Sequence, residues 1–253
     1  REGKIVAAAY RNAFGTEGDE PVLVEANADS ANTLQLEGQT DVDRPVKIMG
    51  SNKAYQLQVG QDAVVRFLRP VTMKGTVRPD FKKGSVTTVC AGWQHSGGTL
   101  ALSGEGLVRF VGTPSSISQF YAQGSLAFEF NCPSNRLASI ICAYSTAGRI
   151  TLGCADAITG CNELSSLANY VLDLNGFDLE VNSFRSTKDG TLTSAAPATL
   201  RTLQSATSTN LETAVTGAVS IEKSGARELA FGGTVASTGA LRVRQGTFRM
   251  LPS

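Results

Sequence analysis

The sequence has little of what marks nucleic-acid-binding proteins. Among its 253 residues there is a single histidine, and the formal net charge is only +1. The basic residues are scattered, and a pair such as Lys82-Lys83 is too short to form a patch. Because the chain has neither a basic stripe nor a broad electrostatic field, we do not expect it to bind nucleic acid.

Long apolar runs are also missing. The longest runs are Ile5 to Tyr10 and Leu137 to Tyr144. Both fall far short of the roughly 20 residues that a transmembrane helix requires, so membrane insertion is not expected. The first residue is Arg1 rather than Met, which indicates a processed product or an excised piece, and no signal peptide is visible.

Charge is scarce as well, since Asp, Glu, Lys and Arg make up 18% of the chain. An average soluble domain has roughly 25%. Ser, Thr, Gly, Asn and Gln take the place of the charged residues. This composition is typical of many short strands that are joined by turns and present neutral polar side chains to water.

Five cysteines are present, and Cys132, Cys142, Cys154 and Cys161 lie close together around turn-like segments. This spacing suggests two local disulfides, Cys132–Cys142 and Cys154–Cys161, and an oxidising compartment. The alternative is buried free thiols, which pack as small apolar groups. Cys90 is left over, either buried or available for an intermolecular bond. A zinc site is not expected, because the chain has no CxxC pair and only one histidine.

Apolar and polar residues alternate over three to five positions, and a Gly, Asn, Asp or Ser then follows. Clear examples are residues 55–60, 99–104 and 126–130. This pattern predicts short strands with one buried and one wet face. Helical periodicity is weak, and only 4–14 and 162–170 are candidates for a turn or two of helix.

Strands this short must stack in numbers to form a stable domain. We therefore predict an all-β fold, specifically a β-solenoid (parallel β-helix) over residues 45–253, in which each coil covers the edge of the next. A β-sandwich or jelly roll would show similar spacing and is the alternative. Residues 1–44 are richer in acids. They are expected to form the first coils or an N-terminal cap, or else an assembly arm that pairs with a neighbouring subunit.

The last third of the chain contains an ordered series of motifs. They are VLDLNGFDLEV at 171–181, GTLT at 190–193, VTGAVSIEKSG at 215–225, ELAFGG at 228–233 and GALRVRQGTFRML at 239–251. In order and spacing, this series resembles the autotransporter-associated β-strand repeat of large bacterial surface proteins. The resemblance implies a secreted or surface-displayed β-helical stalk. The cysteine-containing segment 132–161 departs from the pattern, since such repeats rarely carry cysteine.

In this region the alternating apolar residues are predicted to point inward and stack in columns. They are Leu172, Leu174, Leu179, Val181, Leu192, Val219, Ile221, Leu229, Phe231, Leu241, Val243, Phe248 and Leu251. Asn175-Gly176 is predicted to form a corner between strands, because Asn and Gly tolerate left-handed backbone. A two-residue hairpin turn is the alternative for this dipeptide.

The sequence shows no catalytic constellation. His95 lies in a turn-like segment without a G-x-S-x-G elbow, and we expect it to be a surface or turn residue. Alternating acids occur at Asp41 and Asp43 and at Asp178 and Glu180. Such pairs could cleave glycosides, but on a strand they are usually its wet face.

A polysaccharide lyase would need acidic calcium ligands and a basic residue on one face. Asp173, Asp178 and Arg185 could supply them, but nothing in the sequence distinguishes these residues. No calcium-loop or phosphate-loop motif is present, so no metal or cofactor is predicted. Trp93 and Tyr121, with Phe120, could form a sugar-stacking surface. Core packing of these aromatic rings is the alternative.

Together these observations predict a non-catalytic extracellular structural protein, a stalk, coat or filament subunit that is secreted or held at the cell surface. It would associate with itself by strand addition at its ends. The alternatives are a carbohydrate-binding or polysaccharide-lyase module on a β-helix, with a polysaccharide as partner, and an adhesin.

Overall fold

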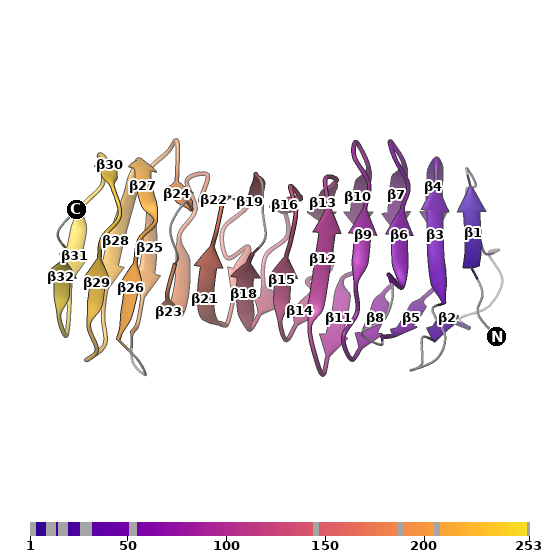
Figure 1. Ribbon diagram of the computed structural model, residues 1–253, viewed down its shortest axis with the longest axis horizontal. Coiled ribbons are helices and arrows are strands. Elements are labelled where there is room, and N and C mark those ends of the chain that lie inside the picture. The colour runs from indigo at the N-terminus through magenta and orange to yellow at the C-terminus, as the bar shows by residue number, and fades with distance from the viewer. Residues whose placement is uncertain are drawn as a thin grey trace.

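The computed structural model describes residues 4–8, 14, 20–25, 32–50, 55–143, 147–186, 190–204 and 208–251. Within these residues the chain is all-β without a helix, and it winds into a solenoid of about 10 turns. Every strand pairing in this part of the chain is parallel. Figure 1 shows the coils stacked along one long axis, with the two termini at opposite ends. The predicted β-solenoid is confirmed, and the parallel pairing excludes the sandwich alternative.

Four sheets form the walls in the described residues. The 12-stranded sheet contains β1 (Lys4–Ala8), β3 (Thr33–Glu37), β6 (Leu57–Val59), β9 (Pro79–Phe81), β12 (Leu100–Gly104), β15 (Phe120–Ala122), β18 (Ser139–Cys142), β21 (Cys161–Leu167), β23 (Leu179–Phe184), β25 (Ala198–Thr202), β28 (Val219–Lys223) and β31 (Leu241–Val243). The 10-stranded sheet contains β4 (Gln39–Val42), β7 (Val64–Phe67), β10 (Val86–Val89), β13 (Leu107–Phe110), β16 (Ala127–Phe130), β19 (Gly148–Leu152), β22 (Tyr170–Asp173), β24 (Thr191–Thr193), β27 (Ala214–Gly217) and β30 (Val235–Ser237).

The remaining two walls are shorter. The 7-stranded sheet contains β2 (Val22–Glu25), β5 (Val46–Met49), β8 (Val71–Lys74), β11 (Trp93–Ser96), β14 (Ser116–Ile117), β17 (Asn135–Leu137) and β20 (Ile158–Thr159). The 3-stranded sheet contains β26 (Thr209–Leu211), β29 (Leu229–Phe231) and β32 (Phe248–Met250).

The cross-section of the solenoid changes after β20. Up to that strand, each coil passes from the 12-stranded sheet to the 10-stranded sheet and then to the 7-stranded sheet. From β25 onward, the chain visits the 3-stranded sheet between the 12-stranded and the 10-stranded sheets. The solenoid therefore has two parts, and most of the repeat-like segment 171–251 belongs to the second.

Residues one coil apart are neighbours in space. Val64 lies beside Val86, and Val86 lies beside Leu107, which are steps of 22 and 21 positions. Residues about half a coil apart lie on different walls. Contacts in this fold are consequently set by the coil repeat and not by proximity in the sequence.

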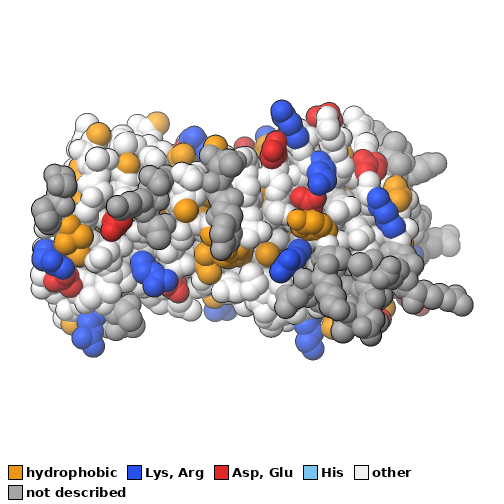
Figure 2. Space-filling model, viewed as in Figure 1, with side chains coloured by type: hydrophobic (Ala, Val, Ile, Leu, Met, Phe, Trp, Pro, Cys, Tyr) orange, Lys and Arg blue, Asp and Glu red, His pale blue; other side chains and the backbone are white. Residues whose placement is uncertain are grey.

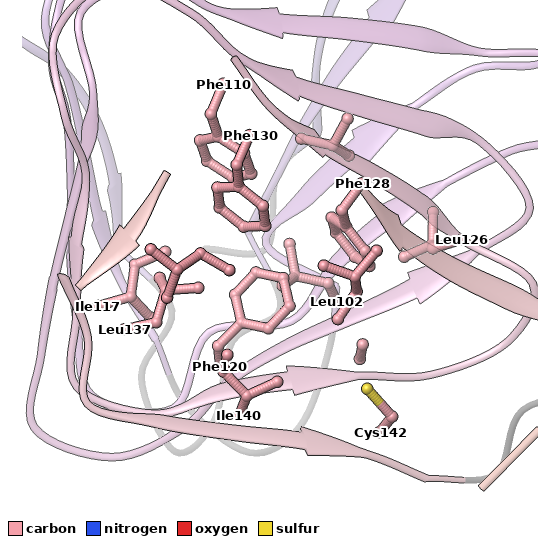
Figure 3. Packing of buried hydrophobic residues seen from close by; sticks show 14 of the residues in the cluster. Leu102, Phe110, Ile117, Phe120, Leu126, Phe128, Phe130, Leu137, Ile140 and Cys142 are labelled. Carbon is pink, nitrogen blue, oxygen red and sulfur yellow. The ribbon is translucent and has the colours of Figure 1, made fainter. Parts of the chain in front are cut away.

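The core consists of columns of buried apolar side chains that run along the solenoid axis. One column passes through Phe67, Val89, Phe110, Phe130 and Leu152. Figure 3 shows the rings of Phe110 and Phe130 stacked on each other. Their centroids are 4.7 Å apart and their planes are 2° from parallel. Burying a large apolar side chain contributes roughly 1.5–3 kcal/mol. The columns are therefore the main source of stability.

Ion pairs on the outside also follow the coil repeat. Among the described residues, eight pairs join positions on adjacent coils: Asp41–Arg66, Asp43–Arg69, Arg109–Glu129, Arg149–Asp173, Glu163–Arg185, Asp178–Arg201, Glu222–Arg244 and Glu228–Arg249. Figure 2 accordingly shows blue and red side chains interspersed, with no large patch of one sign. Each exposed pair contributes only about 0–1 kcal/mol. Their consistent spacing favours the correct register, because a one-residue slip turns a side chain to the other face.

Both helix predictions are wrong in the residues that the structure describes, and residues 9–13 of the first lie outside them. Residues Lys4–Ala8 form β1, and Cys161–Leu167 form β21. The register of β21 against β18 shifts at Leu164, which places one extra residue in the strand. This bulge leaves Cys161, Leu164 and Leu167 buried at a spacing of three, which resembles a helical pattern in the sequence.

The described part of residues 1–44 lies in the same sheets as the rest of the chain. β1 pairs with β3, and β4 pairs with β7. Of the predicted cap or arm, the structure describes residues 4–8, 14, 20–25 and 32–44. Its remaining residues lie outside the described part of the chain.

Asn175-Gly176 forms a corner between coil walls, as predicted. Both residues have positive φ angles, 49° and 85°. The strands on either side, β22 and β23, belong to different sheets and pair in parallel with other coils, so the hairpin alternative is excluded. The Asn175 side-chain amide donates to the Leu152 carbonyl at 3.0 Å, which ties the corner to the previous coil.

Candidate functional site

Neither predicted disulfide is present, because all five cysteines are free thiols. Cys132 follows β16 and Cys154 follows β19, both at the exit of the 10-stranded sheet. Their predicted partners, Cys142 and Cys161, belong to the 12-stranded sheet. The prediction assumed local loops, whereas residues about half a coil apart lie on different walls of a solenoid.

The alternative of buried thiols describes Cys132, Cys142 and Cys161, each of which is at most 2% exposed. Burial raises the pKa of the Cys161 thiol to about 12, and it raises the pKa of Cys142 further still. Such thiols stay protonated at neutral pH and are poor nucleophiles. They serve as small apolar members of the core columns.

His95 is buried rather than a surface or turn residue, which corrects the sequence expectation. It lies in β11, in a column between Met73 and Ile117, and is 5% exposed. Its Nε2 is 2.9 Å from the Gly75 carbonyl, to which it donates. Its Nδ1 accepts a hydrogen bond from the Ser118 hydroxyl at 3.1 Å. Burial lowers the pKa of His95, although the bond to Gly75 opposes this shift.

The solenoid is therefore expected to lose stability as the pH falls below 6.5. His95 has a lowered pKa in the folded state, so the unfolded chain binds more protons between that pKa and 6.5, the ordinary value. The contribution is fully present above pH 6.5 and is lost as the pH falls through the folded-state pKa. Thermal unfolding of the wild type and of His95→Gln between pH 5 and 7.5 measures this contribution of His95 to stability. An equally steep pH dependence in His95→Gln would contradict this assignment.

The acidic pairs suggested by the sequence are occupied by arginines of adjacent coils. Asp41 accepts two bonds from Arg66, at 2.7 and 2.5 Å, and Asp43 lies 3.4 Å from Arg69. Asp178 is 2.8 Å from Arg201. The carboxylates therefore act as members of the surface ion pairs.

The second acidic pair, Asp178 and Glu180, lies in a groove of about 270 Å³. The residues suggested for a lyase form ion pairs with other residues instead. Asp173 pairs with Arg149, and Arg185 pairs with Glu163. In the part of the chain that the structure describes, no group of three or more His, Cys, Asp and Glu could hold a metal ion.

Trp93 cannot contact a sugar, because its side chain is fully buried. Its ring packs against Phe67, Phe81 and Phe110, with centroid distances of 5.5 to 6.4 Å. The core-packing alternative is correct for this residue, and it is also correct for Phe120, which is 0% exposed. Tyr121, in contrast, is partly exposed and lines a groove on the outer face of the 12-stranded sheet.

The C-terminal coil is a second notable surface, because its apolar columns end in the open. In one column Leu200 is 0% exposed, Ile221 is 7% exposed and Leu241 is 49% exposed. In another, Val215 is 2% exposed, whereas Val235 beside it is 60% exposed.

The column in the 3-stranded sheet also changes from buried to exposed at the last coil. Leu211 and Phe231 are buried, and Met250 is 60% exposed. The predicted inward positions up to Phe231 are confirmed, but Leu241 and Val243 are exposed because the described residues contain no further coil over them. The last coil has the pattern of an internal coil without its neighbour.

An apolar hollow of about 300 Å³ opens at this end. It is lined by residues of the last two coils, including Ile221, Phe231, Leu241, Phe248 and Met250. β30, β31 and β32 are also the last strands of their sheets, so each presents one edge without a strand partner in the described residues. Sequence reasoning placed these side chains in columns but could not show which of them are exposed in the described structure.

Comparison with known protein families, curated proteins and solved structures finds no match for this chain. The resemblance of the last third to the autotransporter-associated repeat therefore stays a prediction. No helix in the described residues is long and apolar enough to cross a membrane.

Proposed function

We propose that this chain is a non-catalytic structural β-solenoid that lengthens end to end, with the C-terminal coil of one copy covered by the N-terminal coil of the next. The proposed setting is extracellular, as a stalk, coat or filament subunit. The resemblance of residues 171–251 to the autotransporter-associated repeat supports that setting. The exposed apolar last coil carries the assembly part of the proposal.

Exposing the last coil of a solenoid to water is unfavourable in free energy. Unpaired strand edges readily pair with other strands, and apolar side chains gain free energy when another coil buries them. The inner coils show how far a covering coil buries these positions. The residues one coil before Leu241, Val235 and Met250 are all at most 7% exposed. A covering coil would bring the last coil to the same state.

A second copy can continue two of the solenoid walls at this end. The 12-stranded sheet ends at β1 on one side and at β31 on the other. The 10-stranded sheet likewise runs from β4 to β30. Stacking one copy on the next can therefore continue two walls of the solenoid, with β31 of one copy followed by β1 of the other.

The charges of the two ends are complementary. Residues 1–44 contain nine acidic and four basic residues, a net charge of −5, whereas residues 240–253 contain three arginines and no acid. Within the chain, arginines and acids on adjacent coils pair repeatedly, and in Arg109–Glu129 and Arg149–Asp173 the acid lies on the following coil. A head-to-tail contact would add a pair of this kind. Arg244 and Arg249 already pair with Glu222 and Glu228, whereas Arg242 has no acidic partner among the described residues and is available for it.

Replacing Leu241 with lysine is expected to abolish self-association while leaving the fold intact. Leu241 is 49% exposed in the single chain, so the substitution should change the stability of the monomer by no more than about 0.5 kcal/mol. In the assembly, the same lysine would be a charge buried in an apolar column. Sedimentation velocity over a micromolar-to-millimolar series, with electron microscopy of the most concentrated sample, measures the effect.

Val64→Lys is the matched control. Val64 is also exposed, at 41%, but it lies in β7, which is paired on both sides by β4 and β10. It should assemble like the wild type. A wild-type chain that stays monomeric throughout the series, or a Leu241→Lys chain that assembles normally, would refute the proposed assembly.

A further inference from the structure

A polar groove of about 540 Å³ crosses the outer face of the 12-stranded sheet. Its lining includes Arg78, Thr99, Ala101, Gln119, Tyr121 and Gln123. These residues come from three consecutive coils around β9, β12 and β15. The groove lies on the side of the solenoid, away from the open C-terminal coil.

The hollow exists because a small residue lies between larger ones in an outward column. Ala101 in β12 is in register with Tyr121 in β15, which is in register with Ile141 in β18. The bridge between Val77 and Leu100 places Arg78 at the next position on the other side of Ala101. The alanine methyl group forms the floor, and Arg78 and Tyr121 stand on either side of it.

Arg78 brings an unneutralised charge to this groove. It is exposed and has no acidic partner among the described residues, unlike the arginines of the eight inter-coil pairs. Its backbone is held in place, since its N–H donates to the Gln56 side chain at 2.8 Å. The groove is therefore suited to an anionic group.

The other side chains supply hydrogen-bonding groups. The Thr99 hydroxyl donates to the Gln119 side-chain oxygen, which leaves the Gln119 amide nitrogen as a donor. The backbone beneath is already satisfied, because Leu100 N donates to Gln119 O at 3.0 Å and Ala101 N donates to Val77 O at 2.9 Å. An extended peptide would find no free strand edge here. Hydroxyl groups, in contrast, can bond to the amides directly.

We propose that this groove binds an acidic oligosaccharide. The apolar face of one sugar ring packs on the Tyr121 ring, and the carboxylate of a neighbouring uronic acid pairs with Arg78. Gln119 and Gln123 hydrogen-bond to the sugar hydroxyls. Ala101 provides the space in which the ring lies. This site is separate from the proposed assembly surface and does not depend on it.

Calorimetric titration of the purified chain with an alginate hexasaccharide tests the proposal, with neutral maltohexaose as the comparison. Arg78→Gln should weaken alginate binding about tenfold or more, because it removes a charge-assisted hydrogen bond, and should reduce its salt dependence. Tyr121→Ala should weaken binding of both sugars. Ala101→Phe should abolish binding by filling the groove.

Arg136→Gln is the matched control, since Arg136 is also an exposed arginine but lies in β17 on another wall. It should bind alginate like the wild type. Circular dichroism of each variant confirms that the fold is retained. The proposal is overturned if the wild type does not bind alginate at millimolar concentration, or if Ala101→Phe binds it normally. Tighter binding of poly-glutamate than of alginate would assign the groove to acidic peptides instead.

Discussion

Replacing Gly104 with alanine is expected to lower the free energy of unfolding by about 2–5 kcal/mol, which combines backbone strain with overpacking. Gly104 ends β12 with a φ of 117°, a conformation that L residues rarely adopt. A β-carbon there would lie 1.9 Å from the carbonyl oxygen of Phe81 in the coil below. Because the obstacle is backbone, neither a rotamer change nor a small shift relieves it.

Gly97 is the matched control for this substitution. It also has a positive φ, 68°, but a β-carbon there would meet nothing within 4 Å. Alanine at this position should cost only the conformational strain, about 1 kcal/mol. Denaturant unfolding followed by circular dichroism compares the two variants. Equal losses in both would mean that the close approach of consecutive coils at Gly104 is absent.

Replacing Trp93 with alanine is expected to destabilise the solenoid by about 3–5 kcal/mol. Trp93 is the only tryptophan and is fully buried where three walls meet. Its ring touches aromatic rings from the coil below, its own coil and the coil above. Truncation would leave a cavity that the rigid backbone ladders on all sides cannot close.

Trp93→Phe should cost considerably less. Phenylalanine keeps most of the aromatic volume, and it removes the indole N–H, which has no hydrogen-bond partner among the described residues. Thermal unfolding followed by far-ultraviolet circular dichroism measures both variants. If Trp93→Ala changed stability by less than about 0.5 kcal/mol, the typical effect of a surface substitution, the ring could not be a core residue.

The strand pattern and the columns of the second part could be predicted from the sequence because a two-residue period reports burial directly. Leu172, Leu192 and Phe231 are buried, as the alternation requires. Asn175 is a corner because its residue type favours the left-handed conformation that the corner needs. These features depend on local chemistry, which the sequence contains.

Features that depend on the neighbouring coil could not be predicted. His95 looks like a turn residue until its strand is seen to place it between Met73 and Ile117. Lys223 is fully buried because its ammonium group donates to carbonyls of Gly225 and Gln245, at 2.7 and 2.8 Å. The groove beside Tyr121 likewise depends on which small residue the register places next to the ring.

Hydrogen exchange at β31 tests the proposed end-to-end assembly most directly, because this strand lies at the uncovered end of the 12-stranded sheet. If a second copy adds its first coil there, the amides of Leu241–Val243 should exchange more slowly as the protein concentration rises. The amides of β12, already paired on both sides, should not change. Exchange in β31 that stays fast at every concentration, in wild type and Leu241→Lys alike, would contradict the proposal.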